Sequence, residues 1–191
     1  MQDYREVLDE ILVSEEMLQK RIAELGIEVS RDYRNESLHL VCILRGGVLF
    51  LTDLMRRITV PNTIDFMAVT SYGTAARQST GQVRITMDLK DEIYGRNVLL
   101  VEDIVDSGYT IASVLKFLET RHPKSLRVCA LLDKPERREV EVPIHYRGFT
   151  IPNKFVFGYG LDLDEYYRNL PFVASVNLER YKPAVEPEEV V

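Results

Sequence analysis

The sequence is poor in cysteine and contains no long apolar run. Its two cysteines, Cys42 and Cys129, both lie inside apolar segments, so they indicate buried thiols of a reducing compartment and not a disulfide framework. Every apolar stretch is well short of the roughly 18 residues that a transmembrane helix needs. The first ten residues carry four carboxylates, the wrong charge for a signal peptide. We therefore expect a cytoplasmic protein with no membrane partner.

Basic residues are outnumbered by acidic ones, and histidine is scarce. Lys and Arg number 24 against 30 Asp and Glu, which gives a net charge of −6. This balance argues against a general nucleic-acid binder, although a local basic pocket stays possible. His39, His122 and His145 are scattered without the spacing of metal ligands, so we expect structural roles for them.

What remains is the composition of an ordinary globular domain. The 191 residues are 46% apolar and 28% charged, enough for one domain with a core that needs no disulfide or structural metal. We expect a single domain over residues 1–181, with a core at about 35–150. A small hood would come from about 1–34 and 151–181, and residues 182–191 would form a frayed acidic tail.

Hydrophobic periodicity predicts alternating strands and helices through the middle of the chain. Helical patterns begin after the N-cap Ser14 and are expected to end at Gly26, and they recur at 48–55 and beyond Thr110. Strands are expected at 38–44, 63–70, 83–89, 97–101 and 126–132, with shorter ones near residues 144, 155 and 173. Residues 71–82 read as a mobile loop. The fold class is therefore α/β, with a central, mostly parallel sheet flanked by helices.

Three polar stretches follow expected strands, where open parallel sheets bind ligands. They are residues 45–47, 102–110 and 133–134. In the second, a buried strand ends at Glu102 and Asp103, and a helix opens near Thr110 after Ser107 and a glycine. Backbone N–H groups at that helix start make a phosphate cradle, while the acidic pair suits ribose hydroxyls or a Mg²⁺ ion. The bland alternative is a solvated acidic turn with a helix cap, which leaves three carboxylates beside an apolar strand unexplained.

The run Val101-Glu-Asp-Ile-Val-Asp-Ser-Gly-Tyr-Thr110 closely resembles the signature of type I phosphoribosyltransferases, and most of all the hypoxanthine-guanine phosphoribosyltransferases. The resemblance extends from about Leu38 to Val176. It includes a pyrophosphate loop at 44–47, the start of a lid at 71–73, a base-recognition lysine at 134, a purine pocket at 151–162 and an arginine segment at 164–168. The family's fold, with its small hood, is therefore expected here.

The resemblance implies Mg²⁺-dependent transfer of a phosphoribosyl group from 5-phosphoribosyl diphosphate to a six-oxo purine, with Asp106 as the general base. It implies donor and nucleotide contacts from Arg45, Gly46, Gly47, Ser71, Tyr72, Glu102, Asp103, Asp106, Ser107, Gly108, Tyr109, Thr110 and Arg168. It implies purine contacts from Lys134, Lys154, Phe155, Val156 and Asp162, and metal contacts from Glu102, Asp103 and Asp162. A cis peptide between Leu44 and Arg45 is also implied.

Two alternatives stay open at this point. A phosphoribosyltransferase could use another base such as xanthine, or the fold could serve a regulatory protein that senses nucleotide or binds RNA. The acidic pair together with Asp106 disfavours a sensor, which has no need of a general base, and the net negative charge disfavours RNA. The family further suggests a homodimer or homotetramer, with the helix after Gly47 as an interface.

Overall fold

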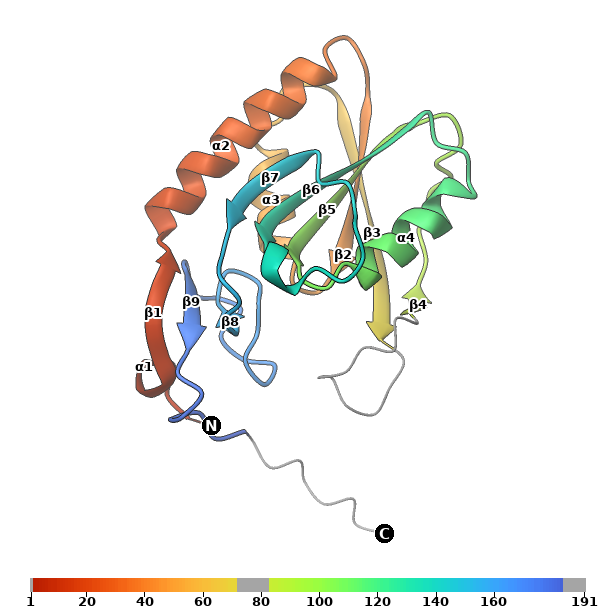
Figure 1. Cartoon of the computed structure of the whole chain (residues 1–191). Coiled ribbons are helices and arrows are strands. Elements are labelled where there is room, and N and C mark those ends of the chain that lie inside the picture. The colour runs from red at the N-terminus through yellow and green to blue at the C-terminus, as the bar shows by residue number, and fades with distance from the viewer. Residues whose placement is uncertain (1, 72–82, 184–191) are drawn as a thin grey trace.

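A six-stranded sheet forms the centre of the computed structural model, which describes residues 2–71 and 83–183 (Figure 1). Its strands run in the order β4 (Val83–Met87), β3 (Asn62–Ser71), β2 (Leu38–Leu44), β5 (Asn97–Val105), β6 (Ser125–Asp133) and β7 (Tyr146–Thr150). All neighbours are parallel except β3 and β4. The predicted fold class is confirmed.

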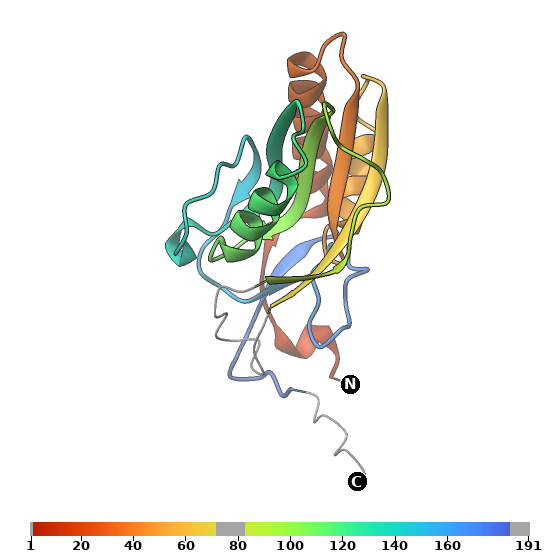
Figure 2. The ribbon, with the colours of Figure 1, turned by 90° about the vertical axis from the view of Figure 1, so that its right-hand side faces the viewer.

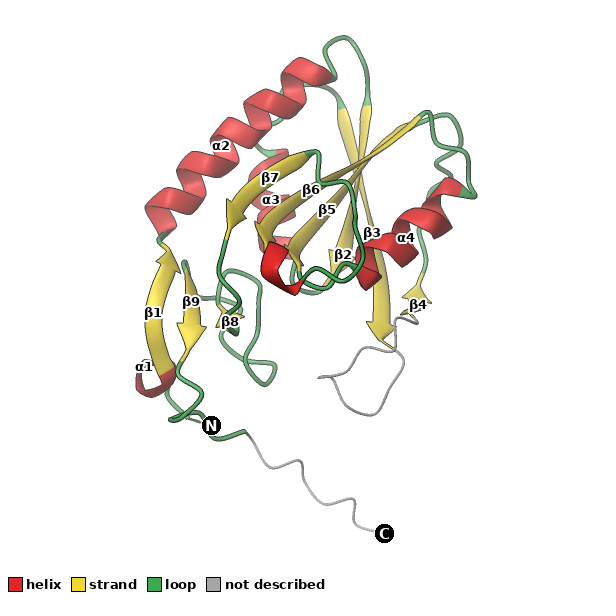
Figure 3. Ribbon diagram, in the orientation of Figure 1, coloured by secondary structure: helices red, strands yellow, loops and turns green. Residues whose placement is uncertain are grey.

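Helices cover both faces of this sheet (Figures 2 and 3). The helices α2 (Glu15–Asp32) and α3 (Val48–Met55) pack on one face, and α4 (Tyr109–Glu119) packs on the other. Successive residues of β2 show the alternation: Leu40 and Cys42 join the first apolar cluster, while Val41 and Ile43 join the second. Strands buried on both faces explain the solidly apolar runs in the sequence.

A second, three-stranded sheet forms a hood beside the carboxyl ends of the central strands (Figure 1). It pairs β1 (Leu8–Val13), β9 (Val173–Val176) and β8 (Val156–Phe157), all antiparallel, and the short helix α1 (Tyr4–Val7) precedes it. The first and last described segments thus lie side by side. Within the predicted hood range 1–34, α2 packs against α3 and β7 of the core. Most of the predicted tail, residues 184–191, falls outside the described part.

The expected end of the first long helix at Gly26 was wrong. Ser14 does cap this helix, accepting a hydrogen bond from the Met17 N–H at 3.3 Å, but the helix runs on to Asp32. Gly26 is buried within it, and a Cβ built there would lie 2.3 Å from the Cβ of Arg57. The glycine therefore allows close packing against the turn after α3. Among the described helices, none is both long and apolar enough to cross a bilayer.

Candidate active site

The loop between β5 and α4 has the geometry of a phosphate cradle. Gly108 caps α4 with a left-handed φ of +94°, and a Cβ there would lie 2.2 Å from the carbonyl oxygen of Val140. Only glycine fits both constraints, so the turn into the helix is fixed by this residue. Within the described part of the chain, the first N–H groups of α4 have no side-chain cap, and Ser107 and Thr110 beside them are partly exposed, an arrangement that suits an anion at the helix N-terminus.

The acidic pair lies inside β5, not after it, because β5 continues to Val105 in register with β6. Glu102 is 7% exposed, and among the described residues its Oε2 atom has no hydrogen-bond partner. Burial, and secondarily the charge of Asp103, raises the pKa of Glu102 well above its usual range. Burial likewise raises the pKa of Asp103 to about 6. Two crowded carboxylates, one with an unpaired buried oxygen, are a donor set that suits a hard divalent cation.

The pyrophosphate-like loop packs directly on this pair. The Leu44–Arg45 peptide is cis, as the resemblance implies. A Cβ on Gly46 would lie 1.5 Å from Oδ2 of Asp103, and one on Gly160 would lie 2.0 Å from the Gly46 carbonyl oxygen. Glycines at both positions therefore let the backbone at 46 approach the Asp103 carboxylate and the backbone at 160 approach that at 46.

The two arginines predicted to bind pyrophosphate share one carboxylate. Glu165 lies 2.8 Å from Arg45 and 3.3 Å from Arg168, and Arg168 also pairs with Asp162 at 2.9 Å. Arg168 and Asp162 both influence the pKa of Asp103, with opposite signs, so they lie close to the acidic pair. The guanidinium groups of Arg45 and Arg168, which come from two distant segments, thus lie close together near the acidic pair. Such a pair of cations suits an anionic ligand.

Asp106 and Lys134 meet across the ends of β5 and β6. Their carboxylate and ammonium groups are 3.8 Å apart, and Arg137 lies 3.3 Å from the other Asp106 oxygen. Lys134 is 6% exposed, and burial lowers its pKa despite the neighbouring Asp106 charge. A partly exposed carboxylate and a buried ammonium group therefore face each other close to the N-terminus of α4.

The predicted purine segment, residues 151–162, has side chains in different surroundings. Val156 is buried in β8, and Phe155 is 52% exposed, which leaves its ring available for stacking. The Lys154 ammonium is held by two carboxylates of β1, at 2.9 Å from Asp9 and 2.5 Å from Glu10. In this structure Lys154 therefore ties the hood together, and its purine contact stays a prediction.

Part of the predicted lid lies outside the described residues. Ser71 ends β3, but Tyr72 falls in the undescribed range 72–82. Tyr109, by contrast, is described as the first residue of α4. The role of the lid residues toward the donor stays a prediction.

A second acidic group lies at the opposite ends of the central strands. His39, Asp65 and Asp91 bring potential metal-ligating atoms within 4.8 Å of one another. Their present contacts are structural: Asp65 accepts the N–H groups of Lys90 and Asp91 at 2.8 and 2.9 Å, and His39 Nδ1 is 2.8 Å from Thr63 Oγ1. This group is separate from the acidic pair on β5.

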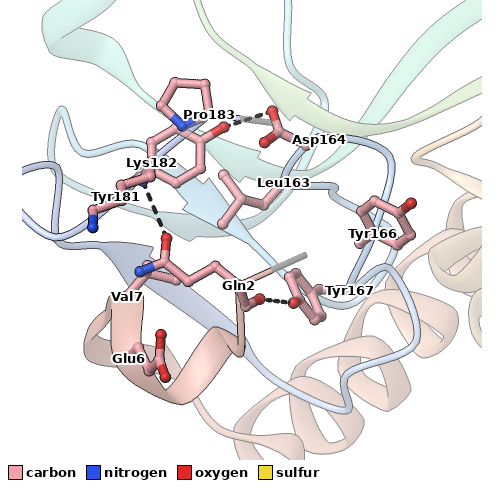
Figure 4. Close-up of a pocket in the computed structure, with 10 residues that line it drawn as sticks. All are labelled: Gln2, Glu6, Val7, Leu163, Asp164, Tyr166, Tyr167, Tyr181, Lys182 and Pro183. Carbon is pink, nitrogen blue, oxygen red and sulfur yellow. Dashed lines mark hydrogen bonds between the residues drawn. The ribbon is translucent and has the colours of Figure 1, made fainter. Parts of the chain in front are cut away.

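A pocket of about 400 Å³ opens on the hood (Figure 4). It lies between the first residues of the chain, the turn at 163–167 and the segment 181–183, where Tyr167 donates to the Gln2 carbonyl oxygen. None of the ten described residues that line it was predicted to contact donor, purine or metal, although Asp164, Tyr166 and Tyr167 belong to the predicted arginine segment. The hollow is therefore distinct from the polar site at the ends of β5 and β6.

Three residues at the site were not found from the sequence: Arg137, Arg138 and Glu165. Arg137 pairs with Asp106, and Glu165 pairs with both predicted arginines. Arg138 is mostly buried, with a side chain 10% exposed, and it pairs with Asp133 between the ends of β5 and β6. The one signal available was the pair of adjacent arginines soon after Lys134, which resembles any charged surface turn.

The chain is similar to known phosphoribosyltransferases over most of its length. A family model described as the phosphoribosyl transferase domain matches residues 9–164. The chain is 49% identical to a hypoxanthine-guanine phosphoribosyltransferase of Mycobacterium avium over 90% of this chain and 87% of that protein. It is 45% identical to the hypoxanthine phosphoribosyltransferase of Escherichia coli, over 88% and 96%. A hypoxanthine phosphoribosyltransferase structure from Staphylococcus aureus is similar with a TM-score of 0.90 and 41% identity, over 95% and 98%.

Proposed function

The chain belongs to the phosphoribosyl transferase domain family, and from that premise we propose that it is a purine-salvage enzyme. It transfers the phosphoribosyl group of 5-phosphoribosyl diphosphate to hypoxanthine, to guanine or to both, giving the nucleoside monophosphate and pyrophosphate. The observation that carries this proposal is the meeting of Asp106 and Lys134, 3.8 Å apart, beside a helix N-terminus that suits a phosphate. Formation of a six-oxo purine nucleotide needs a proton acceptor, a hydrogen-bond donor to the purine oxygen and a phosphate site close together.

The phosphate loop anchors the donor. N–H groups at the start of α4, with the hydroxyls of Ser107 and Thr110, bind the 5-phosphate, while Gly108 keeps the turn open to it. Arg45 and Arg168 exchange their present partner Glu165 for the diphosphate. The donor is then held at both ends with its anomeric carbon between them.

Base recognition depends on Lys134. Its buried ammonium donates a hydrogen bond to the six-position oxygen of the purine. An adenine amino group in that place would leave Lys134 without an acceptor, which disfavours adenine. Phe155 stacks on the ring and Val156 contacts its edge through the main chain. Asp106 accepts the ring proton that the purine loses as it attacks the sugar.

Glu102 and Asp103, with Asp162 close by, are the residues that would hold Mg²⁺, and the unpaired buried oxygen of Glu102 fits this role. When bound, the ion would neutralise charge on the departing pyrophosphate. The carboxylates of the pair also face the ribose and stabilise positive charge that develops on the sugar.

Incubation of the protein with Mg²⁺, 5-phosphoribosyl diphosphate and one purine at a time tests the function. We expect nucleotide and stoichiometric pyrophosphate from hypoxanthine, guanine or both, and none from adenine. Product from xanthine alone would favour the alternative substrate. No product from any purine would overturn the enzymatic function and favour a sensor.

We also propose that the enzyme works in the cytoplasm as a homodimer or homotetramer. Its two cysteines are both buried and free, which suits a reducing compartment. Light scattering on the purified chain tests the oligomeric state, and a monomer across the working concentration range would contradict it.

A further inference from the structure

We infer that Arg138 is a positioning residue that fixes the distance between the purine subsite and the phosphate subsite, an inference that rests on the proposed function. Arg138 is not among the residues predicted to contact the purine or the phosphate. Its side chain is 10% exposed and lies between the end of β5, which leads to the phosphate cradle, and the end of β6, which leads to Lys134.

The contacts of Arg138 join the two strand ends. Its guanidinium donates to a carboxylate oxygen of Asp133, the residue before Lys134. The same group donates from Nε to the carbonyl oxygen of Asp106 at 3.1 Å and from a terminal nitrogen to that of Val105 at 3.4 Å. One planar cation thus holds the backbone of the general base and the neighbour of the base-recognition lysine.

The residues that follow Arg138 add backbone hydrogen bonds to the loop between β5 and α4. The N–H groups of Glu139 and Val140 both donate to the Ser107 carbonyl oxygen, at 2.9 and 3.0 Å. The Val140 carbonyl oxygen lies where a side chain on Gly108 would be. Residues 138–140 therefore form a strap across the phosphate loop, and Arg138 ties that strap to β6.

Neutralisation of the buried Asp133 does not account for this arrangement. Asp133 is 2% exposed and already has a second cation, because Arg147 lies 2.8 Å from its other oxygen. The two carbonyl contacts of Arg138 are not needed to balance charge. They are what a link between the phosphate loop and the purine subsite requires.

A ligand that spans both subsites should be sensitive to this link, whereas its two halves should not. Inosine 5′-monophosphate reaches from Lys134 to the phosphate cradle, while ribose 5-phosphate and inosine each lack one end. Misplacement of one subsite by a fraction of an ångström penalises only the spanning ligand, since each half can shift independently.

The test compares the three ligands on the full-length wild type and on Arg138→Lys, which keeps a charge beside Asp133 but loses the guanidinium fork. Calorimetry measures the nucleotide, and competition against it measures the two fragments. We expect the variant to bind the nucleotide about 10- to 100-fold more weakly and each fragment within about threefold of wild type. Arg127→Lys is the matched control, because Arg127 also makes an ion pair and a hydrogen bond, to Asp32 and Tyr146, away from the site. It should leave all three affinities unchanged.

Equal losses for the nucleotide and both fragments, or an unchanged nucleotide affinity in a folded Arg138→Lys protein, would overturn the inference alone. Arg138→Gln serves as the second variant if the lysine form does not fold, with the same expected pattern. A wild-type protein that binds none of the three ligands would overturn the proposed function and the inference with it.

Discussion

Replacement of Asp103 by asparagine should stabilise the metal-free protein at alkaline pH while it disables the site. Burial raises the pKa of Asp103 from an ordinary value of 3.8 to about 6, so the folded protein at pH 8 carries a carboxylate charge that its surroundings disfavour. Asparagine has the same shape without that charge. Its side-chain oxygen can still accept the Ile104 N–H, which Asp103 Oδ1 accepts at 2.7 Å.

The magnitude follows from linkage between protonation and folding. A rise of about two pH units corresponds to about 3 kcal/mol, an upper bound because Asp103 is partly exposed, and we expect a gain of about 1–2 kcal/mol. The raised pKa means that the folded state keeps a proton that the unfolded chain has released. The contribution of Asp103 to wild-type stability should therefore be lost as pH rises from about 4 to 6, and the advantage of Asp103→Asn should appear over the same range.

Urea unfolding at pH 4 and pH 8, with chelator present and at one protein concentration, measures both effects. Asp65→Asn is a control of opposite sign, because the Asp65 carboxylate accepts three backbone N–H groups, from Phe66, Lys90 and Asp91. Its replacement should destabilise the protein by about 1 kcal/mol at pH 8. The reasoning is refuted if Asp103→Asn is no more stable than wild type at pH 8. It is also refuted if the gain is the same at both pH values.

Three other variants test separate parts of the site. Lys134→Gln should raise the KM for hypoxanthine about 10- to 100-fold and weaken discrimination against adenine, as steady-state kinetics with both bases would measure; an unchanged ratio would contradict its role. Gly108→Ala should raise the KM for 5-phosphoribosyl diphosphate at least about tenfold, because its φ is +94° and the new Cβ meets the Val140 carbonyl oxygen; a normal KM would show that the turn adapts. Glu165→Gln should tighten pyrophosphate binding about two- to fivefold by releasing Arg45 and Arg168 from an exposed ion pair, and weaker product inhibition would contradict this.

The order of strands and helices was predictable because buried parallel strands leave solid apolar runs. The strand beginning at Asn97 was expected to end at Val101, yet it continues through both carboxylates to Val105. A reading based on hydrophobicity ends a strand where acidic residues begin. Here the hydrogen-bonded pairing with β6 carries β5 past both acidic residues. The predicted helix end at Gly26 failed for a related reason. This glycine allows close contact with Arg57, a residue distant in sequence, and does not end the helix.

The residues predicted to touch the ligand came from the family resemblance and from polar stretches at strand ends. The structure brings several of them together because the carboxyl ends of parallel strands meet at one edge of a sheet, and their ligand contacts stay a prediction. The residues that organise the site, by contrast, were not predicted. The partners of Arg138 include two backbone carbonyl oxygens, which leave no trace in residue type. Glu165 lies in a turn with a φ of +70°, a conformation that glutamate rarely adopts and that its sequence neighbours do not indicate.

The most direct test of the site as a whole is the turnover of Asp106→Asn with hypoxanthine and Mg²⁺-bound 5-phosphoribosyl diphosphate. Asparagine keeps the size of the side chain 3.8 Å from Lys134 but cannot take up the purine proton. We predict that kcat falls about 100-fold or more while both KM values stay within about threefold of wild type. Near-normal turnover would remove the proton acceptor from the end of β5, and with it the proposed mechanism.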